Sequence, residues 1–277
     1  MTLRWGRMAY TNALPLYAAF DAGELRFPGV MHSAVPTELN AMLRRGELDA
    51  GPVSAFAYAA DWERYVLLPD LCIGAHDAVR SVLLFSPYPL AELDGIEIAV
   101  TRQSASGDAL LRLLLQSRYG VRPQYVSCDD PFERAAAGRP AFLIGDRAID
   151  ALFAFDPHDV YDLGSLWHQW TGEQSVFAVW VARRQAFAEH ESEVRAGVVA
   201  LVQSRSWGQT HGARVLELAQ RAHARPLGFY EDYYAKLNFN FDLDARRGFA
   251  AFCSRLHAAG AIKSLPPVAQ EEAFAAP

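Results

Sequence analysis

The chain has 277 residues, of which 51% are hydrophobic, 12% aromatic and 21% charged. This composition is typical of a globular protein and excludes a disordered chain. Lys and Arg total 26 against 32 Asp and Glu, a net charge of −6, and the lack of a basic run argues against nucleic acid as a partner. No apolar run approaches the roughly 20 residues of a membrane helix. At roughly 150 residues per domain, the length favours two domains or two lobes.

Motifs for metals and nucleotide cofactors are missing from the sequence. Cys72, Cys128 and Cys253 lie far apart and form no Cys-x-x-Cys pair, so we interpret them as free thiols. There is no metal-binding histidine spacing, no Gly-x-Gly-x-x-Gly, no Walker loop and no Gly-x-Ser-x-Gly elbow. We therefore expect no metal and no cofactor. The N-terminus has charged and turn residues where an export signal needs an apolar core, which favours a cytoplasmic protein.

The first third of the chain alternates between strand and helix patterns. A polar turn, Tyr10–Pro15, separates the first strand from the first helix, and Pro36 begins a second helix that Gly46 ends. Such alternation is typical of a parallel α/β sheet. We predict strands over residues 3–9, 30–35, 48–51, 71–75 and 79–85, and helices that end near residues 22, 46 and 62.

A second α/β run follows, and the pattern then turns helical. Residues 86–90 resemble a segment that crosses between lobes, and a strand over 176–182 could carry the chain back. We predict further strands over residues 96–101, 123–127 and 141–144, and helices over residues 106–119, 131–137, 146–153, 187–203, 206–222, 231–237 and 244–259. The predicted fold is therefore a two-lobed α/β protein with a ligand cleft between the lobes. Lobe 1 would comprise residues 1–86 and 178–277, and lobe 2 residues 87–177.

Three predicted strand-to-helix turns carry small polar residues. They are Thr11-Asn12, Pro52-Val53-Ser54 and the segment Thr101–Gly107, which includes Ser104, Ala105 and Ser106. Each turn places hydroxyl, amide and free backbone N–H groups at a helix start, which suits a carboxylate or a phosphate. The alternative is that these residues are ordinary helix caps, because Ser, Thr and Asn are the preferred capping residues.

Two further segments carry charged groups near predicted strand ends. Alternation along a strand directs Arg80 and Ser81 to opposite faces, so that one of them could face the cleft. The alternative is a rim arginine beside an ordinary strand serine. Asp146 follows a strand and is either a helix cap, which we favour, or a pocket carboxylate. From the residues alone, the prediction stops at a two-lobed protein that binds an anion.

Seven short motifs, in a fixed order, carry a resemblance to a known family. They are Tyr10-Thr-Asn12-Ala-Leu-Pro15; Val35-Pro-Thr37-Glu-Leu-Asn40 with Leu43, Gly46 and Leu48-Asp49; Arg80-Ser81-Val-Leu-Leu-Phe85-Ser86; Thr101-x-x-Ser104-x-Ser106; Tyr161-Asp-Leu-Gly164-x-x-Trp167; Trp170-Thr-Gly172; and Phe177-Ala-Val-Trp180-Val. Each motif alone is weak, but their order and spacing are fairly specific. Together they resemble the chorismate dehydratase family of the futalosine route to menaquinone, up to about residue 240.

The resemblance implies a type II periplasmic-binding-protein fold that works as a cytoplasmic enzyme. This family removes water from chorismate to give 3-[(1-carboxyvinyl)oxy]benzoate. A sister family, 1,4-dihydroxy-6-naphthoate synthase, uses a histidine in the second lobe, where this chain has Leu143-Ile-Gly145-Asp146-Arg147. A non-catalytic small-anion solute-binding protein is the other alternative, and we expect such a protein to carry an export signal. One departure from the family pattern is Glu173-Gln174-Ser175, where a more apolar stretch containing proline is expected.

The resemblance also assigns roles to residues. Asn12 would hold the reacting end of chorismate, and because an amide has no useful basicity it would orient the substrate and abstract no proton. No histidine falls on a motif that matches the family, so the base stays unidentified at this point. The substrate's own enolpyruvyl carboxylate lies close to C3 and could take the proton. The residues expected to bind the substrate are Ser104, Ala105 and Ser106 at one carboxylate, Ser81 and Arg80 assisting, and Ser54 and Asp146. Chorismate is the only partner expected, and the oligomeric state stays open.

Overall fold

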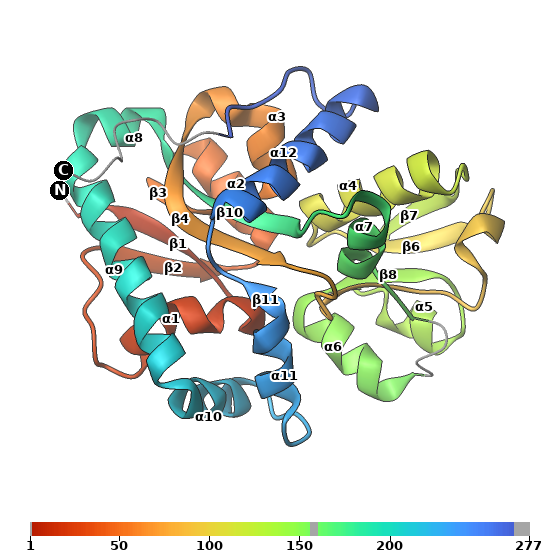
Figure 1. Ribbon diagram of the computed structural model, residues 1–277, viewed down its shortest axis with the longest axis horizontal. Helices are drawn as coiled ribbons and strands as arrows, with labels where there is room; N and C mark the ends of the chain where they lie inside the picture. The colour runs from red at the N-terminus through yellow and green to blue at the C-terminus, as the bar shows by residue number, and fades with distance from the viewer. Residues whose placement is uncertain (1, 156–159, 269–277) are drawn as a thin grey trace.

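The computed structural model describes residues 2–155 and 160–268, which form two β-sheets side by side, each covered by helices (Figure 1). The first sheet has the order β11-β4-β10-β3-β1-β2. Strand β1 is parallel to β2 and β3, whereas β10 is antiparallel to β3 and β4. The bounds of these strands are β1 Arg4–Met8, β2 Val30–Ala34, β3 Ala50–Ser54, β4 Tyr65–Ala75, β10 Ser175–Arg183 and β11 Leu237–Asn238.

The second sheet has the order β7-β6-β8-β5-β9. Its strand β6 is parallel to β7 and β8, and β5 is antiparallel to β8 and β9. The bounds are β5 Val82–Phe85, β6 Glu97–Thr101, β7 Gln124–Cys128, β8 Ala141–Ile144 and β9 Val160–Asp162. We refer to each sheet with its helices as the first and the second lobe.

Helices cover both faces of each sheet. In the first lobe, α1, α9 and α10 lie on one side and α2, α3 and α12 on the other; in the second, α4 and α7 lie opposite α5 and α6 (Figure 1). The bounds are α1 Leu14–Asp21, α2 Pro36–Arg45, α3 Ala55–Asp61, α4 Ala105–Leu113, α5 Phe132–Ala136, α6 Gly145–Ala154, α7 Leu163–Thr171, α8 Arg184–Glu189, α9 Glu191–Thr210, α10 Gly212–Ala222, α11 Phe229–Lys236 and α12 Leu243–Ala258. In the part of the chain described here, no helix is both long and apolar enough to span a bilayer.

The core of the first lobe depends on close approach between α9 and β1. Trp5 is fully buried and packs edge-on against Phe27, with 5.4 Å between ring centroids. A Cβ added to Gly197 would lie 2.3 Å from Trp5 Cζ2, so only glycine lets α9 lie this close to the sheet. Replacing a buried Trp by Ala costs about 3–5 kcal/mol in comparable cores. This packing holds β1 in place, and the chain that leaves β1 enters the cleft.

Asp162 holds the segment that joins the two sheets. It caps α7 by accepting hydrogen bonds from the backbone N–H groups of Gly164 and Ser165. It also accepts from the N–H groups of Val79 and Arg80, which precede β5. Burial raises the pKa of Asp162, and these four N–H groups partly offset that effect. One carboxylate therefore fixes the start of α7 and the chain crossing together.

The two-lobed α/β fold is confirmed, but several details of the prediction differ from the structure. Strand β9 and helix α7 were not predicted, and α9 runs to Thr210, through the break predicted after residue 203. Residues 86–90 are not the crossing segment, because they follow β5, which pairs with β8 and β9. All four residues of β5 are buried, and an apolar run of this kind does not indicate which sheet it joins. Strand β10 begins at Ser175 and lies wholly in the first sheet. We therefore propose that the chain crosses between the lobes at residues 76–81 and 172–174.

Candidate active site

A pocket lies between the two lobes, a common place for a small-ligand site. It is formed where β1, β3, β6 and β8 end and where the helices after them begin. Its lining residues are Met8, Tyr10, Asn12, Pro36, Ser54, Ile73, Ser81, Val82, Ser104, Ala105, Ser106, Gly107, Ile144, Gly145, Phe177 and Ala178. Six of the eight residues predicted from the sequence are thus brought together.

Asn12 lies in a single 3-10 turn, Thr11–Ala13, directly after β1. Its side-chain oxygen Oδ1 is buried and has no hydrogen-bond partner among the described residues. A buried polar atom without a partner costs about 1–3 kcal/mol. Asn12 also does not cap a helix with its side chain, since the cap of this turn is Tyr10 and the cap of α1 is Ala13. The amide is therefore available to a ligand in the pocket.

The N-terminus of α4 supplies the anion-binding geometry of the pocket. Ser104 is the N-cap, and its Oγ accepts a hydrogen bond of 3.1 Å from the Gly107 N–H. The N–H groups of the first helical turn, at Ala105 and Ser106, have no partners within an α-helix. They lie at the positive end of the helix dipole, where an anion is favoured. A Cβ on Gly107 would lie 2.6 Å from Ser104 Oγ, so the cap requires glycine there.

The Ser106 hydroxyl both donates and accepts a hydrogen bond within the protein. It donates to the Phe177 carbonyl of β10 at 2.9 Å and accepts from the Phe56 N–H of α3 at 3.1 Å. Both partners belong to the first lobe, whereas Ser106 belongs to the second. Its hydroxyl therefore joins the lobes beneath the pocket, which leaves its backbone N–H as the group suited to a carboxylate.

Two other serines line the pocket with part of their hydrogen-bonding capacity in use. Ser54 caps α3 by accepting from the Ala57 N–H at 3.3 Å, and it also accepts from Asn40 Nδ2 at 2.9 Å. Both contacts use the oxygen, so the hydroxyl hydrogen of Ser54 can be donated to a ligand. Ser81 donates to the Val79 carbonyl at 3.3 Å and keeps its acceptor capacity.

Arg80 and Asp146 do not line this pocket. Arg80 and Ser81 precede β5, and Arg80 has a φ of +58°, so the strand alternation predicted for them does not apply. Ser81 is the one of the two that lines the pocket. The Arg80 guanidinium forms an ion pair with Asp232 of α11 and lies over the Phe229 ring. Asp146 is not the N-cap of α6, a position that Ile144 occupies. Its carboxylate instead bonds to Thr11, so the structure brings neither Arg80 nor Asp146 into the lining of this pocket.

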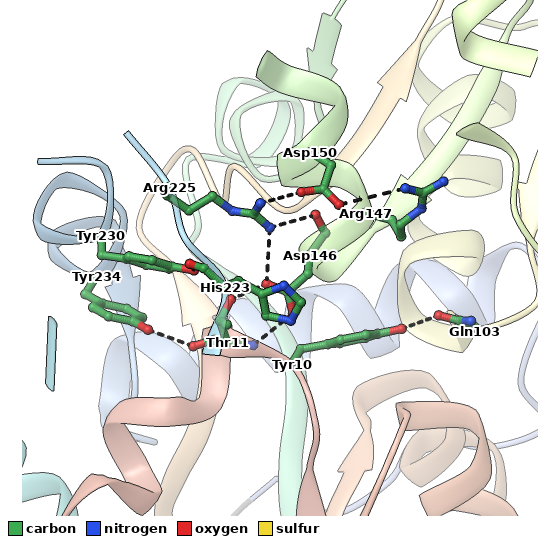
Figure 2. A network of polar contacts seen from close by, with 10 residues as sticks. All are labelled: Tyr10, Thr11, Gln103, Asp146, Arg147, Asp150, His223, Arg225, Tyr230 and Tyr234. Atoms are coloured by element: carbon green, nitrogen blue, oxygen red, sulfur yellow. Dashed lines mark hydrogen bonds and ion pairs between the residues drawn. The ribbon is translucent and has the colours of Figure 1, made fainter. Parts of the chain in front are cut away.

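Tyr10 is a pocket residue that we did not single out from the sequence. Its hydroxyl donates across the cleft to Gln103 Oε1, as Figure 2 shows. Burial, with a contribution from Asp146, raises the pKa of Tyr10, so the phenol stays protonated as a donor at neutral pH. Tyr10 opens the first family motif, and this was the available signal. Pro36, Ile73 and Phe177 complete the apolar wall. Pro36 and Phe177 also lie in family motifs, whereas Ile73 does not.

Comparisons with known proteins agree with this fold. Residues 3–258 match the model of a family described as menaquinone biosynthesis. Over 270 residues the chain is 34% identical to chorismate dehydratase from Thermus thermophilus, covering 91% of this chain and 94% of that protein.

Two solved structures show the fold. A conserved Candida albicans gene product with the generic periplasmic binding protein fold gives a TM-score of 0.69 at 13% identity, covering 97% of this chain and 93% of that one. The alkanesulfonate-binding protein SsuA from Xanthomonas axonopodis, bound to MOPS, gives 0.65 at 16% identity, covering 97% and 96%. With a family match over residues 3–258 and a relative 34% identical along most of its length, the chain belongs to the menaquinone biosynthesis family, together with chorismate dehydratase.

Proposed function

We propose that this protein is a chorismate dehydratase, a hydro-lyase that removes water from chorismate to give 3-[(1-carboxyvinyl)oxy]benzoate. The observation that carries the proposal is the Asn12 amide, which lines a pocket at an anion-binding helix start and whose buried oxygen has no partner in residues 2–155 and 160–268. The likeness to the Thermus enzyme supports the choice of substrate. In this proposal the protein works in the cytoplasm on the futalosine route to menaquinone.

Binding of chorismate uses the groups that the pocket leaves unpaired. One carboxylate is held by the N–H groups of Ala105 and Ser106 at the start of α4, assisted by the Ser54 hydroxyl. Asn12 holds the C4 hydroxyl, with Oδ1 accepting its hydrogen. The apolar wall, including Ile73 and Phe177, contacts the ring and excludes water. These contacts fix the substrate so that the C3–H and C4–O bonds are aligned for elimination.

The reaction is an elimination across C3 and C4. The C3–H bond breaks, its electron pair forms the C3=C4 bond, and the C4–O bond breaks to release hydroxide, which takes up a proton to leave as water. The ring becomes aromatic, so the overall change is downhill and the enzyme has only to lower the barrier. Asn12 contributes by orienting the leaving hydroxyl, since an amide has no useful basicity.

The base is the substrate's own enolpyruvyl carboxylate. Among the described pocket-lining residues there is no carboxylate, histidine or lysine. The one phenol there, Tyr10, has a raised pKa and stays protonated. The carboxylate attached through the C3 ether oxygen lies next to the C3 hydrogen in chorismate itself. The pocket must therefore hold the enolpyruvyl group so that its carboxylate faces the C3 hydrogen.

The proposed function is tested by comparing binding with turnover. Purified protein is mixed with chorismate, and both the thermal unfolding midpoint and the ultraviolet spectrum are followed. A dehydratase consumes chorismate and develops the absorbance of a substituted benzoate. A small-anion solute-binding protein would instead show a raised unfolding midpoint with an unchanged spectrum, and this result would overturn the proposal.

A further inference from the structure

Asp146 is a buried carboxylate whose bonds point away from the pocket to Thr11. The residue is 7% exposed and lies in the first turn of α6 in the second lobe. Its Oδ1 accepts a hydrogen bond from Thr11 Oγ1, and its Oδ2 accepts one of 3.2 Å from the Thr11 N–H. Figure 2 shows both bonds spanning from α6 to the turn after β1. One side chain of the second lobe therefore binds two donors of one residue in the first lobe.

The surroundings of Asp146 hold its carboxylate in one orientation. The N-terminal end of α6 favours a negative charge at this position. Arg225 places Nη2 3.8 Å from Asp146 Oδ1 and donates to the Asp146 carbonyl at 3.3 Å. The same guanidinium forms an ion pair with Asp150, one turn further along α6. His223 Nε2 lies 3.9 Å from Oδ2 (Figure 2). Asp146 is thus a fixed acceptor.

Thr11 is held from its other side as well. Tyr234 of α11 donates a hydrogen bond of 3.0 Å to the Thr11 carbonyl. That carbonyl belongs to the peptide bond that joins Thr11 to Asn12. The N–H, the hydroxyl and the carbonyl of Thr11 therefore all have partners, and Thr11 is itself buried. The amide oxygen of Asn12, in contrast, has none.

We propose that Asp146 is a positioning residue for Asn12. Because the Asn12 amide oxygen has no protein partner before the substrate arrives, the backbone that precedes it sets the direction of the side chain. Asp146 fixes that backbone through Thr11 and does so from the opposite lobe. The Asn12 geometry is therefore complete only when the lobes are together. This inference rests on the proposed dehydratase function.

The first experiment measures kcat and KM for chorismate in Asp146→Ala, Asp146→Asn and Phe153→Ala proteins. Asp146→Ala should lower kcat by about 100-fold, the size of loss expected when a catalytic group is misplaced by about 1 Å, with a smaller change in KM. Asp146→Asn should recover part of the loss, since its amide can still bond to Thr11. Phe153→Ala removes a ring contact across the lobes, between α6 and Phe229 of α11, and Phe153 takes no part in the contacts of Asp146 described above. Its kcat should stay near that of the wild type. If Phe153→Ala lowers kcat as much as Asp146→Ala does, the inference is wrong.

A second pair of variants covers the case in which Asp146→Ala does not fold. Thr11→Val keeps the shape of the side chain and removes the hydroxyl donor, whereas Thr11→Ser keeps that donor. The inference predicts a large fall in kcat for Thr11→Val and near-normal kcat for Thr11→Ser, with both proteins folded by circular dichroism. Equal kcat in the two folded variants would overturn it.

A double-mutant cycle separates positioning from a general effect on lobe closure. If Asp146 acts through Asn12, then Asp146→Ala in an Asn12→Ser background should lower kcat by less than about threefold beyond Asn12→Ser alone. If the two losses multiply, Asp146 acts independently of Asn12 and the inference fails. Failure of the proposed function looks different, because the wild-type protein would then not convert chorismate at all.

Discussion

Gly145 lies against the ring of Tyr10, so close that a Cβ on Gly145 would be 2.9 Å from the ring atoms Cγ and Cδ2. The two residues come from opposite lobes and both line the pocket. Gly145 also has a φ of +61°, a conformation that residues with a Cβ rarely adopt. Glycine at this position therefore allows two things: the left-handed backbone turn into α6, and the close contact with Tyr10 that closes the pocket.

A Gly145→Ala variant should lose affinity for chorismate as well as stability. The left-handed conformation alone costs about 1–2 kcal/mol for a residue with a Cβ, and the added methyl group pushes Tyr10 away and opens the pocket. Gly138→Ala is the matched control, because Gly138 has a φ of +65° and nothing within 4 Å of an added Cβ. Both variants should unfold at lower temperature, but only Gly145→Ala should raise KM. An unchanged KM in Gly145→Ala would show that this contact does not close the pocket.

Ser106→Ala should destabilise the protein more than Ser104→Ala does. Ser106 joins the lobes through Phe56 and Phe177, and its loss leaves a backbone N–H and a carbonyl unpaired in a buried place, at about 1–3 kcal/mol. Ser104 is a helix cap, worth about 1 kcal/mol. Urea unfolding of the two variants, at equal denaturant slope, measures the difference. A smaller loss in Ser106→Ala would contradict the pairing seen here.

Asn12→Ser should keep stability and lose activity. The Asn12 amide oxygen forms no hydrogen bond with the part of the chain that the structure describes, so its replacement removes no such bond there. Loss of one oriented group at a reacting bond should lower kcat by about 100-fold. Thermal unfolding tests the predicted stability, and steady-state kinetics test the predicted loss of activity. Full activity in the serine variant would remove Asn12 from the reaction.

Asp49 gives the protein part of its stability against acid. Burial by itself would raise the pKa of Asp49, but hydrogen bonds from the Arg4 side chain and N–H and from Arg183 outweigh that effect and lower the pKa to about 2. These contacts tie the segment before β3 to β1 and to the end of β10. The folded pKa lies below the ordinary value of 3.8, so the contribution is fully present above that value. It is then lost as the pH falls towards 2.

An Asp49→Asn variant tests this contribution. The variant should be less stable than the wild type at neutral pH, and the gap between the two free energies of unfolding should narrow as the pH falls from 3.8 towards about 2. Urea unfolding at a series of pH values measures the gap. A gap that stays constant over that range would mean that the Asp49 carboxylate is not ionised preferentially in the folded state.

Local patterns in the sequence predicted the parts of the site that depend on neighbouring residues. Ser54 and Ser104 cap α3 and α4 through bonds to residues three positions ahead. The role of Asp146 depends on its contact with Thr11, which is 135 positions away in the chain. A pattern among neighbouring residues cannot indicate a contact between residues so far apart. The same limit applies to β5, whose pairing with β8 and β9 is set by the fold. Strands β9 and β11, with three and two residues, are too short to show a period.

The measurement that tests the central claim most directly is a mass-spectrometric time course of chorismate with the purified protein and its Asn12→Ser variant. The account predicts a single product, lighter than chorismate by one water, formed by the wild type with or without a chelator and far more slowly by the variant. A product that has lost pyruvate instead of water would contradict it. So would chorismate that stays intact in the presence of folded wild-type protein.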